Sequence, residues 1–416
     1  MMGFQNFEIQ KVATPSASLT DVWMLLILLL MILASLKRKA TRILDRSQTD
    51  QLRGLAILLI IIGHFWVHTA ARQPKLILGD AGVSLFFILS GFGLTCSSWN
   101  RSTPLSSFAK KRMLRVFVPY WWSTALILVL DALFLHRTYR PSDLLLTLAG
   151  LNLTPTVDRI DFVRWFITLL ILWYMLFFAV QAIPRTAIRI GLLFLAAALL
   201  FLLDYYVAHL GWYQLFSFPV GCLLALERDR IASFFEERRN TRRLLFTALT
   251  GSMAVILFKV VLQEELVQRI PSILLQGLVE AVDIIGSLSA LTFIGLLARF
   301  SLASSLLIVT GGLSYELFLL HGPFLIKYNF ILRVPHVVLG LFADIAFIVF
   351  IAFCFRAATG RATALIGSLY ARVKRGANPH DSNDPLLCLP AAPPAAATDE
   401  NPNRPGMEAF PSRDSG

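Results

Sequence analysis

The chain has 416 residues, of which 56% are hydrophobic and 15% are charged, and its formal net charge is +12. A mean hydropathy of +0.67 excludes an ordinary soluble globular protein of this length. The basic residues fall in short loops between apolar runs, which argues against a nucleic-acid-binding surface. Because the apolar runs are long and do not alternate, they exclude a β-barrel and predict an all-α polytopic membrane protein.

Eleven apolar segments approach or exceed the length that a membrane span requires. The first is short, so a tilted span, a signal anchor and an interfacial helix are all compatible with it. Placing the following KRKATR loop in the cytoplasm puts most of the 38 lysines and arginines on one side, which predicts a cytoplasmic C-terminus. The segments are 22–36, 52–68, 79–97, 113–135, 162–183, 187–204, 212–226, 244–262, 272–298, 303–328 and 336–356.

The end of the chain differs in composition from the rest. From about residue 376 it is rich in Pro, Ala, Asn and Asp, which predicts a largely disordered tail. The four cysteines are far apart and match no metal-ligand spacing, so we expect no metal site.

The stretch LRGLAILLIIIGH, residues 52–64, carries a charge at one end and a titratable ring at the other. Eleven residues at 100° each make three turns plus 20°, so Arg53 and His64 share one helical face, about 16 Å apart along the axis. An ionisable group inside a membrane needs a partner or a cavity, which makes His64 a candidate functional residue. A packed or interfacial histidine is the alternative.

Two further stretches lie on the next predicted helices. GVSLFFILSGFG, residues 82–93, has small residues among bulky ones, which permits close approach of a neighbouring helix or of a thin ligand. In KKRMLRVFVPYWW, residues 110–122, Arg112 and Arg115 are three apart on one face. Paired guanidinium groups suit phosphate oxygens, although ordinary anchoring by basic residues explains most such clusters.

Polar residues recur at helical spacing in two later segments. In GGLSYELFLLHGPFL, residues 311–325, Ser314 and His321 are seven apart and so lie close to one helical face. Glu280 and Asp283 belong to a polar stripe from 276 to 287, and two carboxylates must face the bundle interior or water. Fastening neighbouring helices is the alternative role of this stripe.

Taken together and in this order, these stretches resemble the acyltransferase-3 family of integral membrane O-acyltransferases. The resemblance covers about residues 45–357 and implies a ten-helix core, to which 22–36 adds one N-terminal helix. It divides the chain into an N-terminal segment, 1–44, a membrane acyltransferase domain, 45–357, and a cytoplasmic tail, 358–416. The shared features are Arg53 and His64 after TDQ, GVSLFFILSGF, RMLR followed by PY, the WF…Y segment Trp165, Phe166 and Tyr174, and SYELFLLHGP.

The resemblance implies transfer of an acyl group, often acetyl, from cytoplasmic acyl-CoA to a hydroxyl of a carbohydrate or lipid-linked glycan. Such enzymes are commonly multi-pass proteins of the bacterial inner membrane. In this interpretation Arg53, Arg112 and Arg115 bind the phosphates of CoA at the cytoplasmic face. His64 then acts as the general base, and an acyl-histidine intermediate is the alternative mechanism.

The acceptor is less well defined by the sequence. The remaining polar positions, Glu280, Asp283, Ser314 and His321, are the candidate acceptor-binding residues. Family members often carry a glutamate five residues after the tryptophan of WF…Y, and this chain has Leu170 there. Interior carboxylates, histidines and broken helices also describe proton-coupled transporters of small solutes, which are the alternative class.

Overall fold

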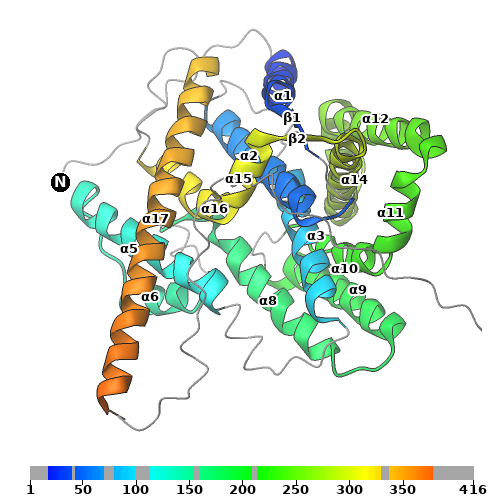
Figure 1. Cartoon of the computed structure of the whole chain (residues 1–416). Coiled ribbons are helices and arrows are strands. Elements are labelled where there is room, and N and C mark those ends of the chain that lie inside the picture. The colour runs from blue at the N-terminus through cyan, green and yellow to red at the C-terminus, as the bar shows by residue number, and fades with distance from the viewer. Residues whose placement is uncertain are drawn as a thin grey trace, which may run out of the picture. The chain divides into compact units, whose positions relative to one another are not determined.

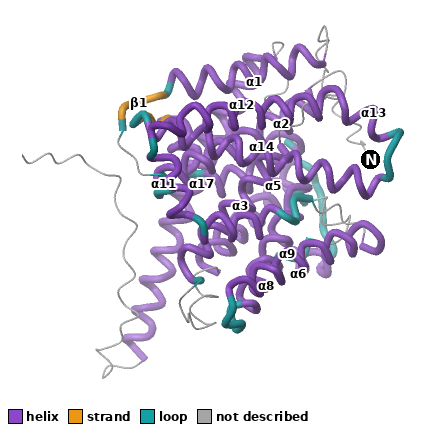
Figure 2. Tube along the Cα trace, turned by 90° about the vertical axis from the view of Figure 1, so that its right-hand side faces the viewer, coloured by secondary structure: helices purple, strands orange, loops and turns teal. Residues whose placement is uncertain are grey.

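The structure is a computed structural model that describes residues 17–39, 43–69, 79–99, 113–152, 160–208, 213–328 and 337–377. These residues are almost entirely helical (Figures 1 and 2), as the composition predicts. Residues up to Ala357 form one compact unit, and those from Ala358 form another. Residues 378–416, for which disorder is predicted, lie outside the described residues.

The elements below keep the labels of Figure 1, with η for 3-10 and π turns. They are α1 Ala17–Ala34, β1 Leu36–Arg38, α2 Arg46–Thr69, α3 Gly79–Ser98, η1 Met113–Phe117, α5 Val118–Phe134, α6 Pro141–Leu148, η2 Phe162–Arg164, α8 Trp165–Val180, α9 Thr186–Leu203, η3 Asp204–Ala208, α10 Ser217–Leu226, α11 Arg228–Glu236, η4 Arg238–Asn240, α12 Thr241–Leu257, η5 Phe258–Leu262, α13 Gln263–Val267, α14 Ser272–Arg299, β2 Leu302–Ser304, α15 Ser305–Gly312, α16 Ser314–Gly322, η6 Pro323–Lys327 and α17 Val337–Ala377.

Each of the eleven predicted apolar segments overlaps at least one helix in the described part of the chain. Eight of the helical segments are long and apolar enough to cross a membrane, and α15 with α16 makes a ninth if the 71° bend between them belongs to one span. The segment at 212–226 supplies only the ten-residue helix α10, which is too short to cross. The all-α membrane architecture is therefore confirmed, with eight or nine candidate spans among the described residues.

The helices around α2 and α3 pack closely because glycines remove side-chain bulk at the crossings. A Cβ atom on Gly82 of α3 would lie 2.5 Å from the carbonyl oxygen of Ala56 in α2, and one on Gly91 would lie 2.2 Å from that of Phe218 in α10. Both distances are far below van der Waals contact, so only glycine fits. The helix-packing interpretation of GVSLFFILSGFG is correct at these two positions.

A two-stranded antiparallel ribbon joins the N-terminal segment to the connection between α14 and α15. Strand β1 pairs with β2 (Figure 1), and Leu36 lies opposite Ser304. The hydroxyl of Ser304 accepts a hydrogen bond from the backbone N–H of Leu307 at 3.2 Å and caps α15. The backbone N–H of Ser304 donates to Oε1 of Gln51 on α2 at 2.9 Å. The ribbon therefore ties α1, α2 and α15 together near Arg53.

Candidate active site

A cavity of about 790 Å³ is lined by side chains of α2, α3, η1, α5, α8, α15, α16 and α17. Its charged lining combines more arginines than carboxylates, which gives the cavity a positive field that suits a polyanion. These charged residues are Arg46, Asp50, Arg53, Arg115, Glu316 and Arg356.

Ion pairs hold several of these guanidinium groups near the cavity. Nη1 of Arg53 lies 2.7 Å from Oδ1 of Asp50, and Nε of Arg46 lies 4.0 Å from the other oxygen of the same carboxylate. Elsewhere in the lining, Nε of Arg356 lies 3.7 Å from Oε1 of Glu316. Partly exposed ion pairs contribute little to stability, so a ligand phosphate can compete for these arginines at small cost.

The structure brings two of the three predicted phosphate-binding arginines together in this cavity. Arg53 reaches it from α2 and Arg115 from η1, while Arg112 lies outside the described residues. Sequence reasoning missed Arg46 and Arg356, which line the same cavity. The spacing of seven between Arg46 and Arg53 is a signal for one helical face, but nothing in the sequence places Arg356 beside them.

The cavity follows one face of α3. The lining positions run from Ser97 through Gly93 and Ser90 to Phe86, which is about 16 Å along a helix axis. A Cβ on Gly93 would meet no atom within 4 Å, and the same holds for Gly312 of α15, which also lines the cavity. These two glycines leave open space, in contrast to the tightly packed Gly82 and Gly91.

His64 and His321 form a direct pair. Nδ1 of His64 lies 3.0 Å from Nε2 of His321, and the two rings are within 4° of parallel. Nδ1 of His321 lies 2.8 Å from the carbonyl oxygen of Phe318 and 3.2 Å from that of Leu317. Carbonyl oxygens only accept, so Nδ1 of His321 donates, and in the neutral ring its Nε2 accepts the proton of His64 Nδ1. The lone pair of His64 is then on Nε2.

The histidine pair lies next to the cavity but does not line it. Phe318 lines the cavity, and the centroid of its ring is 5.7 Å from that of His321. The ring of Phe162 meets His64 edge to face at 5.1 Å. His321 is fully buried and His64 is half-buried. Phe318 therefore borders the charged cavity and also contacts the histidine pair.

A family model described as an acyltransferase domain, that of the acyltransferase-3 family, matches residues 47–359. The chain belongs to the acyltransferase-3 family. No curated protein and no solved structure shows significant similarity to it. Membership makes the chain a multi-pass membrane O-acyltransferase. The enzyme is therefore favoured over the proton-coupled transporter considered above.

Among the described residues, no group of three or more His, Cys, Asp and Glu side chains is arranged to hold a metal ion.

The four predicted acceptor-binding residues of the acyltransferase do not lie together. Ser314 lines the charged cavity, and His321 pairs with His64. Glu280 and Asp283 line neither the cavity nor the histidine pair, because they face η5 and the residues before α10.

The contacts of Glu280 and Asp283 are internal to the helix bundle. Oδ1 of Asp283 lies 2.8 Å from the buried Nζ of Lys259, and Oδ2 accepts a hydrogen bond from Gln214 at 2.7 Å. Oε2 of Glu280 accepts a hydrogen bond from the backbone N–H of Phe216 at 3.4 Å. Acceptor binding by these carboxylates stays a prediction.

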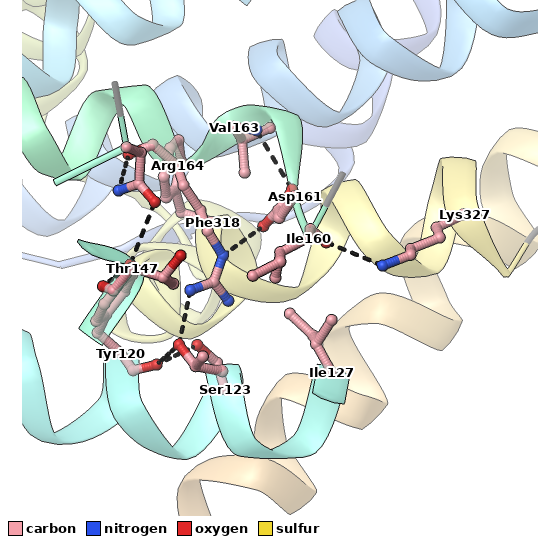
Figure 3. Close-up of polar contacts among 12 residues, drawn as sticks. Tyr120, Ser123, Ile127, Thr147, Ile160, Asp161, Val163, Arg164, Phe318 and Lys327 are labelled. Carbon is pink, nitrogen blue, oxygen red and sulfur yellow. Dashed lines mark hydrogen bonds and ion pairs between the residues drawn. The ribbon is translucent and has the colours of Figure 1, made fainter. Parts of the chain in front are cut away.

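A second arginine–aspartate pair, between α5, α8 and α16, was missed by sequence reasoning (Figure 3). Nη1 of Arg164 donates to the hydroxyl of Thr124 at 2.6 Å, and Nε lies 3.6 Å from Oδ2 of Asp161. The guanidinium carbon lies 4.8 Å from the centroid of the Tyr120 ring. Burial raises the pKa of the Asp161 carboxyl to about 6, although the Arg164 guanidinium opposes the shift.

This buried pair adjoins the histidine pair through Gly322. A Cβ on Gly322 would lie 2.7 Å from Oδ1 of Asp161, so glycine after His321 lets the segment before α8 approach. Beyond it, Lys327 forms an ion pair with the fully buried Asp131 and donates to the backbone carbonyl of Ile160 at 3.2 Å. These contacts fix the surroundings of His321 without contributing to the charged cavity.

Proposed function

We propose that this acyltransferase moves an acyl group, acetyl above all, from acyl-CoA to a hydroxyl of a carbohydrate or lipid-linked glycan. The observation that carries the proposal is the contact of 3.0 Å between His64 and His321, because it puts the lone pair of His64 on Nε2. A neutral imidazole in that tautomer is a suitable general base for a hydroxyl group.

The donor occupies the charged cavity in this proposal. The phosphates of CoA bind Arg53 and Arg115 together with Arg112, and the newly found Arg46 and Arg356 extend this positive region. The pantetheine arm then runs along the open face of α3, past Gly93 toward the aromatic end of the cavity. The arginine end faces the cytoplasm of a bacterial inner membrane, and the C-terminus lies on the same side.

The reaction needs one proton to move twice. As the acceptor oxygen attacks the thioester carbonyl carbon, Nε2 of His64 takes the hydroxyl proton, the new C–O bond forms and the C–S bond breaks. The imidazolium then returns the proton to the thiolate sulfur of CoA. Nδ1 of His64 keeps its proton throughout, and its hydrogen bond to Nε2 of His321 orients the ring and stabilises the positive charge. His321 is thus a positioning residue, and direct transfer requires no acyl-histidine.

The test measures acetyl transfer from labelled acetyl-CoA to a glycan fraction by purified enzyme. His64→Ala should lower kcat by about 100-fold or more, since general-base catalysis contributes that much, and should leave KM for acetyl-CoA nearly unchanged. Full activity of His64→Ala would contradict the proposal.

A matched pair of variants examines the positioning role. His321→Gln keeps a side-chain oxygen that can accept the proton of His64 Nδ1, whereas His321→Ala does not. The glutamine variant should therefore retain several-fold more activity than the alanine variant at equal KM. Equal loss in both variants would show that His321 acts through packing alone.

Acceptor binding by Glu280 and Asp283 belongs to the same proposal. Carboxylates bind pairs of sugar hydroxyls well, and Oε1 of Glu280 is buried without a hydrogen-bond partner among the described residues. Glu280→Gln should impair transfer to the glycan but spare slow hydrolysis of acetyl-CoA. Equal loss of both reactions would remove these residues from the acceptor site.

A further inference from the structure

Three phenylalanine rings from three different helices meet at the end of the charged cavity. Phe86 of α3, Phe166 of α8 and Phe318 of α16 all line the cavity. Their ring centroids are 6.2 Å apart for Phe86 and Phe166, 4.7 Å for Phe166 and Phe318, and 6.3 Å for Phe86 and Phe318. All three distances lie in the range of attractive aromatic contacts, so the rings form one packed cluster, the aromatic wall.

The aromatic wall adjoins both the cavity and the histidine pair. Phe318 lines the cavity and its ring packs against that of His321, while neither His64 nor His321 lines the cavity. Phe166 also packs against Phe87, whose ring centroid is 4.6 Å away. Phe86 is half-buried whereas Phe166 and Phe318 are buried, so Phe86 is the most accessible of the three rings.

Apolar side chains line the cavity beside the aromatic wall. They include Leu89 and Leu170, and Leu170 occupies the position where family members often carry a glutamate. This end suits hydrocarbon, whereas the arginine end suits phosphate. A thioester that enters from the arginine end therefore brings its acyl group against apolar side chains and the three rings, next to the histidine pair.

We propose that the aromatic wall of Phe86, Phe166 and Phe318 sets the length of the acyl chain that the donor carries, and that it selects acetyl-sized groups. The inference rests on the proposed function, because the thioester carbonyl has to come next to the histidine pair. The chain beyond that carbonyl is then packed against the three rings. Interiors are close-packed, so a longer chain must displace at least one ring, and misfits of single methylenes change rates by about 10- to 200-fold.

The first experiment compares the rates at which the purified enzyme releases free CoA from acetyl-CoA, butyryl-CoA and octanoyl-CoA. The natural enzyme should prefer acetyl-CoA to octanoyl-CoA by at least about tenfold in kcat/KM. Phe86→Ala should lower that preference by about tenfold or more, because it opens space at the most accessible ring. The preference is a ratio, so it does not depend on how much of a variant folds.

Phe177→Ala is the matched control on α8. Phe177 is fully buried, contacts Trp99 and Phe218, and does not line the cavity. It should lower the amount of folded enzyme yet keep the preference for acetyl-CoA. An equal change of preference in Phe177→Ala and Phe86→Ala, or no change in Phe86→Ala, would overturn the role of the wall.

The second experiment measures binding of S-ethyl-CoA, S-butyl-CoA and S-octyl-CoA, thioethers that cannot transfer an acyl group. The affinity of the natural enzyme should fall as the alkyl chain of the thioether lengthens. The affinity of Phe86→Ala should depend much less on that chain length. Chain-independent binding in the natural enzyme would overturn the inference even if acyl transfer is observed. Length-dependent binding without release of CoA from any thioester would support the wall and contradict the proposed function.

Discussion

Two aspartate–arginine pairs with the same sequence spacing lie in opposite surroundings. In the cavity, Asp50 and Arg53 are three residues apart, and their side chains are 25% and 28% exposed. Between the helices, Asp161 and Arg164 are also three residues apart, and both side chains are 1% exposed. The sequence spacing is the same, whereas the burial of the two pairs differs greatly.

The difference shows which of the two arginines is available to a ligand. Arg53 shares an exposed cavity with further arginines, so a phosphate gains several donors there and displaces only a weak ion pair. Arg164 is enclosed by Thr124, Tyr120 and its own aspartate, so it has no route to a large anion without unpacking the helices. We therefore assign binding to the first pair and structural support to the second.

The largest expected effect comes from breaking the buried pair. Arg164→Gln should lower the free energy of unfolding by about 3 kcal/mol at pH 8, because it leaves the buried Asp161 carboxylate without its counter-charge. Losing the arginine raises the pKa of Asp161 further, so the carboxyl takes up a proton more readily, and the loss should be smaller at pH 5. Thermal unfolding in detergent at both pH values measures this.

The double variant Asp161→Asn with Arg164→Gln is the control for that prediction. It removes both charges, so it should recover part of the stability and lose the dependence on pH between 5 and 8. The structural assignment would be wrong if Arg164→Gln left stability unchanged and instead raised KM for acetyl-CoA.

Breaking the exposed pair of Asp50 and Arg53 should weaken substrate binding and leave stability nearly unchanged. Arg53→Gln should raise KM for acetyl-CoA by about 10- to 100-fold, the value of one or two charge-assisted hydrogen bonds, and should change the unfolding temperature little. Steady-state kinetics at several acetyl-CoA concentrations separate KM from kcat. A fall in kcat at constant KM would place Arg53 at the reacting atoms instead of the phosphates.

Filling the open space beside Gly93 should have a smaller effect. The leucine side chain of Gly93→Leu would project into the cavity, so the variant should bind CoA about fivefold more weakly. It should lose no stability, because a Cβ at this position meets no atom within 4 Å. Gly191→Leu is the matched control, because Gly191 also has no atom within 4 Å of its Cβ position but does not line the cavity. Equal binding of CoA by the two variants would exclude the cavity as the donor site.

A higher salt concentration should produce the smallest of these effects, and it should affect only the exposed pair. Raising NaCl from about 0.05 M to about 0.5 M should increase KM for acetyl-CoA by about threefold, because exposed charges are screened, and should leave the buried pair unaffected. The loss of unfolding free energy in Arg164→Gln should be the same at both salt concentrations. A salt-independent KM would argue against phosphate binding by Arg53 and Arg115.

The helices were predictable because lipid requires every backbone group to be satisfied within its own segment, so long apolar runs are helices. Spacing also predicted correctly that Arg53 and His64 lie on one helix, α2, and that α3 presents small residues to its neighbours. The contact between His64 and His321 was not predictable in this way, because 257 residues separate them and only the packing of α16 on α2 brings them together.

The polar residues were harder to interpret than the apolar ones. Asp283 was singled out as a carboxylate inside a span, but its partner Lys259 lies in another helix, where it interrupts a predicted apolar segment. Likewise, nothing local distinguishes Asp161 and Arg164 from Asp50 and Arg53. Which neighbour compensates a buried charge depends on the tertiary arrangement, and one sequence carries no direct signal for that.

The ribbon of β1 and β2 has a practical consequence for anyone who shortens this protein. The match to the family begins at residue 47, which suggests a natural place to cut. Yet the backbone N–H of Ser305 donates to the carbonyl of Ser35 at 3.0 Å, and that of Lys39 donates to the carbonyl of Ser301 at 2.8 Å. Removal of the first 44 residues would leave these groups and the edge of β2 without partners beside the capping serine of α15. The boundary of the family and the boundary of the folding unit are therefore different.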